Sequence, residues 1–452
     1  MNVTVNIHPN ETTREGFAPV ELRLDNGTKL CSLDLQYSVL AQLPRSNPVA
    51  VDFLLIAAAV YAIDKLFKRD NADDAWTRII SLTIPVSNVA CWKAVEKRFD
   101  RCLSFLTGDI WTLNFGEREN DPIRPQRRRR RVRRNLLNRP PRGDTVSLFS
   151  GGLDSLVGVI DWLEENRQRN LLLVGHHESD IPGPFDDQRA LLGRLHQAYP
   201  GRITSLLVRV GHTDEGSDDT EITLRGRSLI FVALGIFAAS AIGPAIPLIV
   251  PENGTIALNV PLTPSRRGSC STRTAHPRYL AILSEILAAV GLANSISNPL
   301  RHRTKGEVLQ LCRNQNVLHA AAHLAVSCAK RGHKVHWTRR SATSCGRCMP
   351  CIYRRAAMHL VGWDDEVYGD DICAGEVDLA ANAEKPNDLR ACLSFLRKNP
   401  NAAEIATMLM ASGSLDIRGL DADAEMVRRT MDEIRNLIRN KGTADIKRLA
   451  GL

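Results

Sequence analysis

The first 17 residues, MNVTVNIHPNETTREGF, lack both a basic segment and a long apolar segment. A secretory signal peptide needs both, so we expect none and predict a cytoplasmic protein. The chain also lacks an unbroken apolar run of membrane-spanning length. Its most apolar stretch, residues 229–250, is interrupted by Gly243-Pro244 and by Pro247, which predicts a buried helix followed by a short strand at 248–250. We therefore expect no membrane contact.

Residues 121–142 contain a single acidic residue and no aromatic residue, but ten arginines. Their net charge of +9 equals the formal net charge of the whole chain, so the other residues sum to zero. The prolines and the repulsion between like charges predict an extended linker. Two roles stay open for this linker: contact with nucleic acid or another polyanion, or a solvated tether between domains.

A chain of 452 residues is too long for one ordinary core, so we expect several domains. Residues 1–120 predict an N-terminal α+β accessory domain, and residues 121–142 form the linker. Repeated strand and helix segments in residues 143–368 predict an α/β domain with a parallel sheet covered on both faces. Residues 369–452 predict a C-terminal helical region. Within the N-terminal domain, we interpret Asp64 and Trp76 as packing or capping residues.

The most distinctive motif is SGGLDS, from Ser150 to Ser155, which lies between an apolar strand and an amphipathic helical segment. A strand that stops at Ser-Gly-Gly and continues as a helix leaves unpaired N–H groups in one concavity, with the helix dipole behind them. The glycines let a phosphate approach the backbone, the two serine hydroxyls add donors, and Asp154 is placed to orient a metal ion or water. The motif predicts an anion site.

Two further segments carry residues suited to the same chemistry. Lys305 follows a threonine at the predicted start of a helix and supplies compact positive charge for a departing phosphate. The segments HHESD (176–180) and PENG (251–254) each follow a predicted strand, as SGGLDS does. Ligands of parallel sheets bind at the carboxyl ends of the strands, so we expect all three segments to open onto one crevice.

Three of the eleven cysteines, Cys345, Cys348 and Cys351, lie in one seven-residue segment, CGRCMPC. Thiolates at this spacing converge on one tetrahedral zinc ion. Disulfides are not expected in a cytoplasmic chain. The fourth ligand has to come from elsewhere in the sequence.

SGGLDS, LRGRSLIFVALG, TKGEVL, and AVSC with CGRCMPC, in this order, resemble the motifs of QueC, the 7-cyano-7-deazaguanine synthase family of PP-loop ATPases. The resemblance covers about residues 143–365. It implies a HUP-like (adenine nucleotide alpha hydrolase) fold that uses ATP, Mg²⁺ and Zn²⁺. It implies that ATP is bound by Ser150, Gly151, Gly152, Leu153, Asp154 and Ser155, and that catalysis involves Lys305, Arg227 and Asp154. It also implies Cys328 as the fourth zinc ligand, with His336 as the alternative.

The segment that follows the last predicted strand of the α/β domain departs from the family pattern. Polar and cationic residues there suit recognition of a purine-like base and a carboxylate. We predict that a 7-carboxy-7-deazaguanine-like substrate is bound by Glu252, Asn253, Arg273 and His276. The alternative interpretation is a surface loop rich in serine and arginine.

The flanking regions resemble the additions found in QueC-like proteins of bacterial antiphage systems, and they favour the QatC-like branch of the Qat system. The resemblance implies a ligase that adenylates a carboxylate and then forms an amide or nitrile. Protein partners from the same defence operon are expected, and a homodimer is considered. Two alternatives stay open: a PP-loop tRNA-modifying enzyme, and a nucleic-acid-binding scaffold with a degenerate PP-loop.

Overall fold

The computed structural model describes residues 1–8, 16–123, 141–178, 183–213, 221, 223, 225–263, 273–331, 334–380, 386–413 and 415–452. Most of the arginine-rich segment, residues 124–140, lies outside the described residues, so its predicted role stays a prediction.

Ten described strands form one mixed sheet in the order β10-β9-β6-β7-β8-β3-β2-β1-β4-β5. The pairs from β10 to β8 and from β1 to β5 are parallel, and the pairs that join β8, β3, β2 and β1 are antiparallel. The strands are β1 (Asn2–Ile7), β2 (Val20–Leu24), β3 (Lys29–Leu35), β4 (Ile79–Val86), β5 (Ile110–Glu117), β6 (Thr145–Leu148), β7 (Leu171–His177), β8 (Ile203–Thr213), β9 (Leu248–Ile249) and β10 (Ile296–Ser297).

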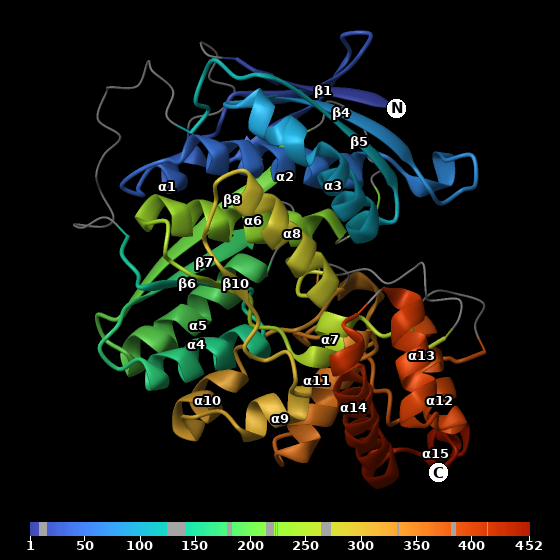
Figure 1. Cartoon of the computed structure of the whole chain (residues 1–452). Coiled ribbons are helices and arrows are strands. Elements are labelled where there is room, and N and C mark those ends of the chain that lie inside the picture. The colour runs from blue at the N-terminus through green and yellow to red at the C-terminus, as the bar shows by residue number, and fades with distance from the viewer. Residues whose placement is uncertain are drawn as a thin grey trace.

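Helices cover the sheet and form the lower right part of the molecule in Figure 1. The first eight are α1 (Tyr37–Leu40), α2 (Pro48–Leu66), α3 (Val89–Thr107), α4 (Leu153–Glu165), α5 (Pro184–Ala198), α6 (Arg225–Ile242), α7 (Gly254–Leu258) and α8 (Pro277–Ala289). The others are α9 (Lys305–Gln310), α10 (Gln315–Ala322), α11 (Met349–Leu360), α12 (Asn387–Lys398), α13 (Ala402–Ser412), α14 (Leu420–Lys441) and α15 (Ala444–Ala450). Short 3-10 helices are η1 (Arg69–Asn71), η3 (Lys334–His336) and η4 (Ile417–Gly419).

The mixed α/β architecture and the parallel order of β9, β6, β7 and β8 agree with the predicted α/β class. The sequence did not predict that β3 pairs with β8, which continues the sheet into the N-terminal region. One hydrophobic core also spans both parts and includes Phe53 of α2, Leu103 of α3 and Phe237 of α6, all buried. The N-terminal region therefore packs directly on the α/β part, as Figure 1 shows.

Helix α6 is the one helix, among the described residues, that is long and apolar enough to cross a membrane, and 83% of that stretch is buried inside the protein. It ends at Ile242, before Gly243-Pro244, and β9 follows at Leu248. This confirms the predicted division of the apolar stretch into a buried helix and a strand. Helix α6 packs against α2, so its apolar surface belongs to the core.

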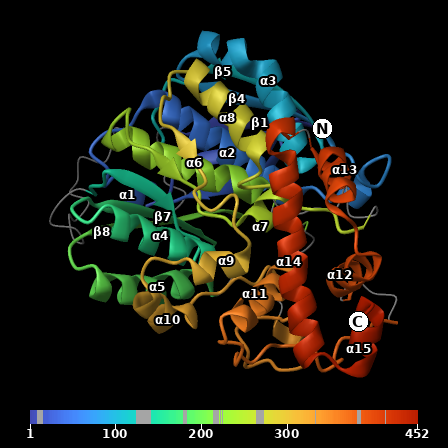
Figure 2. The same ribbon diagram turned by 60° about the horizontal axis from the view of Figure 1, so that its bottom comes forward.

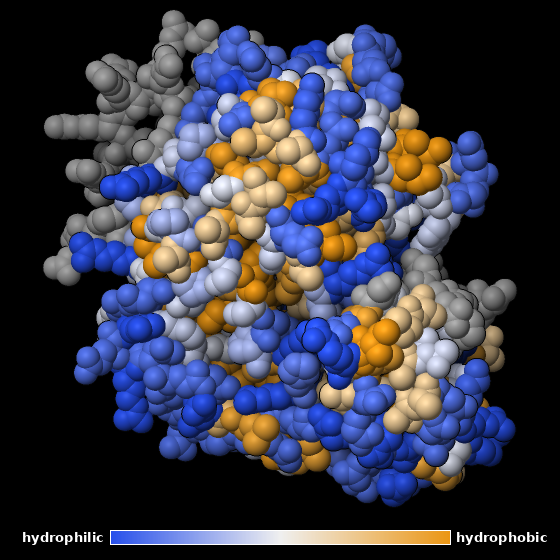
Figure 3. All heavy atoms as spheres, in the orientation of Figure 1, coloured by the Kyte–Doolittle hydropathy of each residue, from blue (hydrophilic) through white to orange (hydrophobic). Residues whose placement is uncertain are grey.

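The C-terminal helices α12 to α15 form a second core together with α11. The apolar side of α14 is buried there, including Met431, Ile434 and Leu437. Figure 2 shows α14 as a long helix that runs past α9 and α11. On the face seen in Figure 3, hydrophilic side chains cover most of the lower part, and hydrophobic ones gather toward the centre.

Candidate functional site

The SGGLDS segment connects β6 to α4 in a tight turn. Gly151 has a φ of +87°, a left-handed conformation that glycine adopts readily, and Gly152 occupies the N-cap of α4. The Ser155 hydroxyl donates to the Gly152 carbonyl oxygen at 2.9 Å, and the Gly152 N–H donates to the Ser150 hydroxyl at 3.3 Å. Because glycine has no side chain to cap α4, the turn suits a ligand with acceptor oxygens.

A cavity of about 160 Å³ lies beside this turn. Its walls come from the turn itself, the first residues of α6 and the segment after β9. The lining residues are Leu148, Ser150, Ser155, Arg227, Ser228, Phe231, Val250, Pro251, Glu252 and Thr274. Four residues predicted for the site, Ser150, Ser155, Arg227 and Glu252, therefore share one cavity.

Asp154 and Lys305, 151 residues apart in the chain, form a buried ion pair. The Lys305 Nζ lies 2.8 Å and 2.9 Å from the two carboxylate oxygens of Asp154. Asn253 donates from its side-chain amide to Asp154 Oδ2 at 2.8 Å, while its own Oδ1 accepts from the Ile256 N–H of α7. The structure thus brings together Asp154, Lys305 and Asn253, three residues that the sequence placed in one site.

Glu252 links this buried cluster to the cavity that it lines. Burial raises its pKa to about 8, and the negative charge of Asp154 adds to the rise. The positive charge of Lys305 acts in the opposite direction. Glu252 therefore holds its proton at neutral pH, and a hydrogen bond with Asp154 also favours this protonated form.

Replacing Glu252 with glutamine is expected to change how stability depends on pH. A pKa raised above 4.5 in the folded state means that the folded protein binds more protons than the unfolded chain between about pH 4.5 and 8. Stability from this group is present below this window and lost as pH rises through it. Relative to wild type, Glu252→Gln should gain on the order of 2 kcal/mol between pH 5 and pH 8, measured by urea unfolding.

The matched control is Glu285→Gln, which changes an exposed carboxylate on α8. The free energy of unfolding of this variant should depend on pH as that of wild type does. Parallel curves for wild type and Glu252→Gln would contradict the assignment of a raised pKa to Glu252.

Arg227, in the first turn of α6, is placed to meet a ligand in the cavity. Its Nε is buried and has no hydrogen-bond partner within the described part of the chain, and its guanidinium lies 5.3 Å from the ring centre of Phe231. The neighbouring Ser228 hydroxyl lies 2.7 Å from that of Thr274. A buried guanidinium N–H without an acceptor favours binding of an anion at this end of the cavity.

Arg273 and His276 do not join the cavity-lining residues in the structure. The Arg273 guanidinium lies 4.3 Å from the ring centre of Phe105 on α3 and donates to the Phe105 carbonyl oxygen. His276 caps α8, accepts from the Arg278 N–H and meets Phe105 edge-on. Burial and the neighbouring arginines lower its pKa to about 3. These contacts join the segment before α8 to the N-terminal region.

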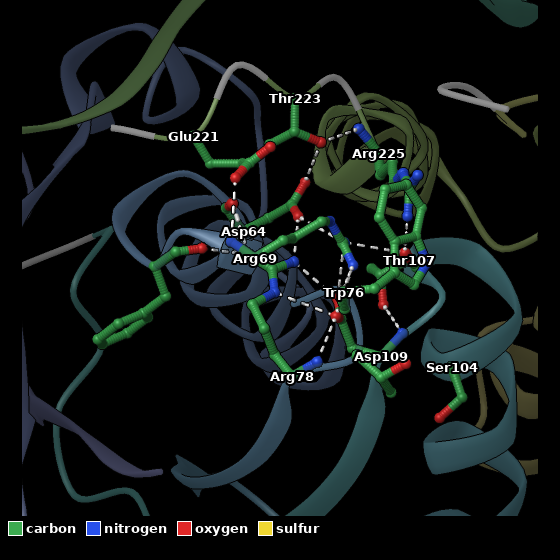
Figure 4. A network of polar contacts seen from close by, with 12 residues as sticks. Asp64, Arg69, Trp76, Arg78, Ser104, Thr107, Asp109, Glu221, Thr223 and Arg225 are labelled. Atoms are coloured by element: carbon green, nitrogen blue, oxygen red, sulfur yellow. Dashed lines mark hydrogen bonds and ion pairs between the residues drawn. The ribbon is translucent and has the colours of Figure 1, made fainter. Parts of the chain in front are cut away.

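A buried network from the N-terminal region holds the start of α6 (Figure 4). Asp64 of α2 accepts the Gly226 N–H at 2.8 Å and the Thr223 hydroxyl at 3.0 Å with Oδ2. A Cβ at Gly226 would lie 3.0 Å from Tyr61 Cα, so α2 and α6 approach closely here. Asp64 therefore caps the helix that carries Arg227, in line with the capping role interpreted from the sequence.

The Asp64 carboxylate is held in turn by arginines. Arg78 Nη2 lies 2.7 Å from Asp64 Oδ1 and 2.7 Å from Asp109 Oδ2, and Arg69 pairs with Asp109 at 2.8 Å. Arg225 donates to the Thr107 carbonyl oxygen, and burial with the nearby charge of Arg69 lowers its pKa to about 10. The network couples α2, η1, the residue before β4 and the end of α3 to the first two residues of α6 (Figure 4).

Asp64→Ala is expected to lower the free energy of unfolding by about 3–5 kcal/mol, because it leaves Arg78 and the Gly226 N–H buried with fewer acceptors. Asp64→Asn should lose less, since its amide oxygen can still accept from Gly226. Urea unfolding measures both. Asp73→Ala, an exposed neighbour, should stay within about 0.5 kcal/mol of wild type, and an equal loss in Asp73→Ala and Asp64→Ala would contradict the capping role.

The described part of HHESD also faces the N-terminal region. Glu178 accepts from the Tyr61 hydroxyl and the Lys65 ammonium group, both on α2. His176 is fully buried, and its Nε2–H donates to the Val210 carbonyl oxygen at 2.9 Å. Burial and the charge of Arg227 hold the pKa of His176 well below its usual range, so it stays neutral beside Phe231, which lines the cavity.

Cys328, Cys345, Cys348 and Cys351 form a cluster that could hold a metal ion such as zinc. Their sulfur atoms all lie within 4.8 Å of one another, and Cys345 Sγ is 3.9 Å from Cys351 Sγ. A tetrahedral zinc ion with Zn–S bonds of about 2.3 Å places its sulfur ligands about 3.8 Å apart, which fits this arrangement. The cluster includes Cys328, and His336 is exposed and lies outside it.

The cysteine cluster is linked to the SGGLDS turn through the residues around Cys328. The Val326 N–H donates to the Gly151 carbonyl oxygen at 2.9 Å. Ser327 Oγ is buried without a partner among the described residues, and it lies 3.5 Å from where a Cβ of Gly152 would be. Arg331 pairs with Asp187 of α5 at 2.8 Å and donates to the Thr343 carbonyl oxygen. The position of the turn therefore depends on the cysteine segment.

No family model, curated protein or solved structure in the comparisons matches this chain. The site thus rests on its own geometry. Sequence reasoning missed Glu433 of α14, which contacts both neighbours of Lys305. For Asp64 the sequence did give a local signal of a capping or packing role, because an acidic residue stands there near the end of an apolar helix.

Proposed function

We propose that the protein uses ATP to adenylate a carboxylate, most closely one of the 7-carboxy-7-deazaguanine type, and then forms an amide or nitrile. The observation that carries this proposal is the buried Asp154–Lys305 pair behind a glycine turn that opens onto a cavity with Arg227 and Glu252 in its wall. The order of motifs that resembles the QueC family supports the same chemistry.

In this proposal, the N–H groups of the SGGLDS turn and the hydroxyls of Ser150 and Ser155 bind the β- and γ-phosphates of ATP. Lys305 and Arg227 stabilise the negative charge that builds up as pyrophosphate leaves. The protonated Glu252 places no negative charge in the wall of the cavity that receives the second substrate's carboxylate. Binding both substrates in one place orients the carboxylate for in-line attack.

The reaction proceeds in two displacements. A carboxylate oxygen bonds to the α-phosphorus while the bond from that phosphorus to the bridging oxygen breaks, and pyrophosphate leaves with the electron pair. An amine then attacks the acyl carbon, loses a proton and displaces AMP, which gives an amide. Where ammonia is the amine, a second ATP is attacked by the amide oxygen at its α-phosphorus and loses pyrophosphate. The nitrogen then loses two protons while the C–O bond breaks, which gives a nitrile and AMP.

Mg²⁺ is part of the proposal because the Asp154 carboxylate offers the hard oxygen donors that this ion prefers. Bound there with the phosphates, Mg²⁺ would neutralise charge on the leaving pyrophosphate. The cysteine cluster has a different role. With four protein ligands, a zinc ion keeps no open coordination position, so we assign it a structural function.

The test is ATP–pyrophosphate exchange with 7-carboxy-7-deazaguanine. Wild type should show exchange that depends on this carboxylate, and Asp154→Ala should show none. Asp186→Ala, which removes an exposed carboxylate from the first turn of α5, should exchange at the wild-type rate. Absence of substrate-dependent exchange in wild type would exclude the proposed function.

We also propose antiphage defence as the biological setting, on the resemblance of the flanking regions to Qat proteins. In that setting, an amine of a partner protein from the same operon is a reasonable nucleophile in place of ammonia. The product would then be a deazaguanine-modified protein. Mass spectrometry of the partner after reaction would reveal it, and free nitrile as the sole product would argue against protein modification.

A further inference from the structure

The C-terminal helix α14 runs beside the segment that carries Lys305 (Figure 2). Two ion pairs tie the helix to this segment. Arg429 Nε lies 2.6 Å from Glu307 Oε1, and Arg301 Nη2 lies 3.4 Å from Asp423 Oδ2. Both pairs are partly exposed, so each contributes modestly to stability. They place α14 along residues 301–307.

One turn beyond Arg429 on α14, Glu433 is buried against both neighbours of Lys305. Its carboxylate accepts from the Thr304 hydroxyl, and Oε2 accepts the Gly306 N–H at 3.2 Å. Thr304 is fully buried, and Lys305 is 4% exposed. One carboxylate therefore fixes the backbone on each side of the lysine that pairs with Asp154.

Gly306 provides the space that this contact needs. A Cβ at this position would lie 2.5 Å from Glu433 Oε1 and 2.5 Å from Leu360 Cδ2 of α11. Real Cβ atoms do not approach other atoms so closely, so the carboxylate fits only against glycine. The match between Gly306 and Glu433 indicates a specific contact and not chance packing.

We propose that Glu433 is a positioning residue that sets the place of the Lys305 ammonium group, an inference that rests on the proposed function. Lys305 itself contacts Asp154 and, in the proposed function, the phosphates, whereas Glu433 acts through the Thr304 hydroxyl and the Gly306 N–H. The C-terminal region thereby contributes to the phosphate site.

The electrostatic surroundings of Glu433 support this role. Burial raises its pKa to about 7, and the charge of Glu307 adds to the rise. The Thr304 hydroxyl, the Gly306 N–H and the charge of Arg429 act in the opposite direction. Together, these groups on α9 and α14 leave the pKa of Glu433 near neutral pH. The contacts with Thr304 and Gly306 favour the charged form of the carboxylate.

The experiment compares Glu433→Ala, Glu433→Gln and Asp432→Ala in the full-length protein. Asp432 is the matched control, because it lies next to Glu433 on α14 but is partly exposed and pairs with Arg428 and Arg435. Glu433→Ala should lower kcat for ATP–pyrophosphate exchange about 10- to 100-fold, with little change in KM for the carboxylate. Glu433→Gln should stay within about threefold of wild type, because its oxygen can accept from Gly306 and its amide can donate to Thr304.

A second readout does not need turnover. Acetic anhydride labels exposed lysine amines, and mass spectrometry measures the labelling rate of Lys305. In Glu433→Ala, Lys305 should be labelled at least several-fold faster than in wild type, and in Asp432→Ala at the wild-type rate. Where Glu433→Ala does not fold, Glu433→Asp replaces it, since the shorter side chain withdraws the carboxylate but keeps the charge.

The two readouts separate the two proposals. No exchange in wild type with faster Lys305 labelling in Glu433→Ala would reject the function but keep the positioning role. Equal Lys305 labelling in wild type and Glu433→Ala, or equal loss of kcat in the alanine and glutamine variants, would reject the positioning role.

Discussion

Lys305→Met is expected to lower the rate of ATP–pyrophosphate exchange by about two to three orders of magnitude. Methionine keeps most of the side-chain length but removes the positive charge that the proposed mechanism places at the departing pyrophosphate. The buried position of Lys305, 4% exposed, strengthens the effect, because water cannot replace the missing charge. Initial rates at saturating ATP measure the loss.

This substitution also leaves Asp154 buried without its partner, which costs about 3–5 kcal/mol of stability. The double variant Lys305→Met/Asp154→Asn should recover part of that stability, because it removes the unpaired charge, yet it should stay inactive. Lys441→Met, a partly exposed lysine that pairs with Asp364, should exchange normally. Recovery of exchange in the double variant would show that Lys305 acts only through stability.

Loss of metal from the four-cysteine cluster is expected to unfold the local segment and to abolish ATP binding. A structural zinc ion contributes about 10–16 kcal/mol of binding free energy in small zinc domains, and the thiolates repel one another without it. The Val326 N–H then no longer holds the Gly151 carbonyl oxygen in place. Cys348→Ser should therefore lose bound zinc and show faster hydrogen exchange in both the cysteine segment and the SGGLDS turn.

Cys91→Ser, which changes a partly buried cysteine of α3 outside the cluster, should keep one zinc ion per chain and normal exchange. Zinc content is measured by atomic emission. Full protection of the SGGLDS turn in zinc-free protein would contradict the link between cluster and turn. Iron or persulfide at the cysteines would instead favour the sulfur chemistry of tRNA-modifying enzymes.

The sequence predicted those parts of the site that local patterns determine. A strand, Ser-Gly-Gly and an amphipathic helix specify the turn at 150–155, and the CGRCMPC spacing specifies three of the four clustered cysteines. The break at Gly243-Pro244 likewise specified where α6 ends. In each case, the residues that determine the structure are neighbours in the chain.

The rest depends on contacts between distant segments, which periodicity does not reveal. Asp64 meets Gly226 across 162 residues, and Glu433 meets Gly306 across 127. Arg273 has the charge expected of a substrate-binding residue, but a favourable contact with Phe105 draws its side chain to α3. Residue type alone does not distinguish the two uses of an arginine.

The antiparallel pairing of β3 with β8 has a consequence for any attempt to isolate the α/β part of the chain. In the whole protein, β3 satisfies the backbone groups of residues 210–213. A fragment that begins after the linker would expose them as the open edge of a sheet, next to the apolar surface of α6 that α2 covers. Open strand edges beside apolar surface promote aggregation, so a fragment without the N-terminal region is expected to aggregate where the whole chain does not.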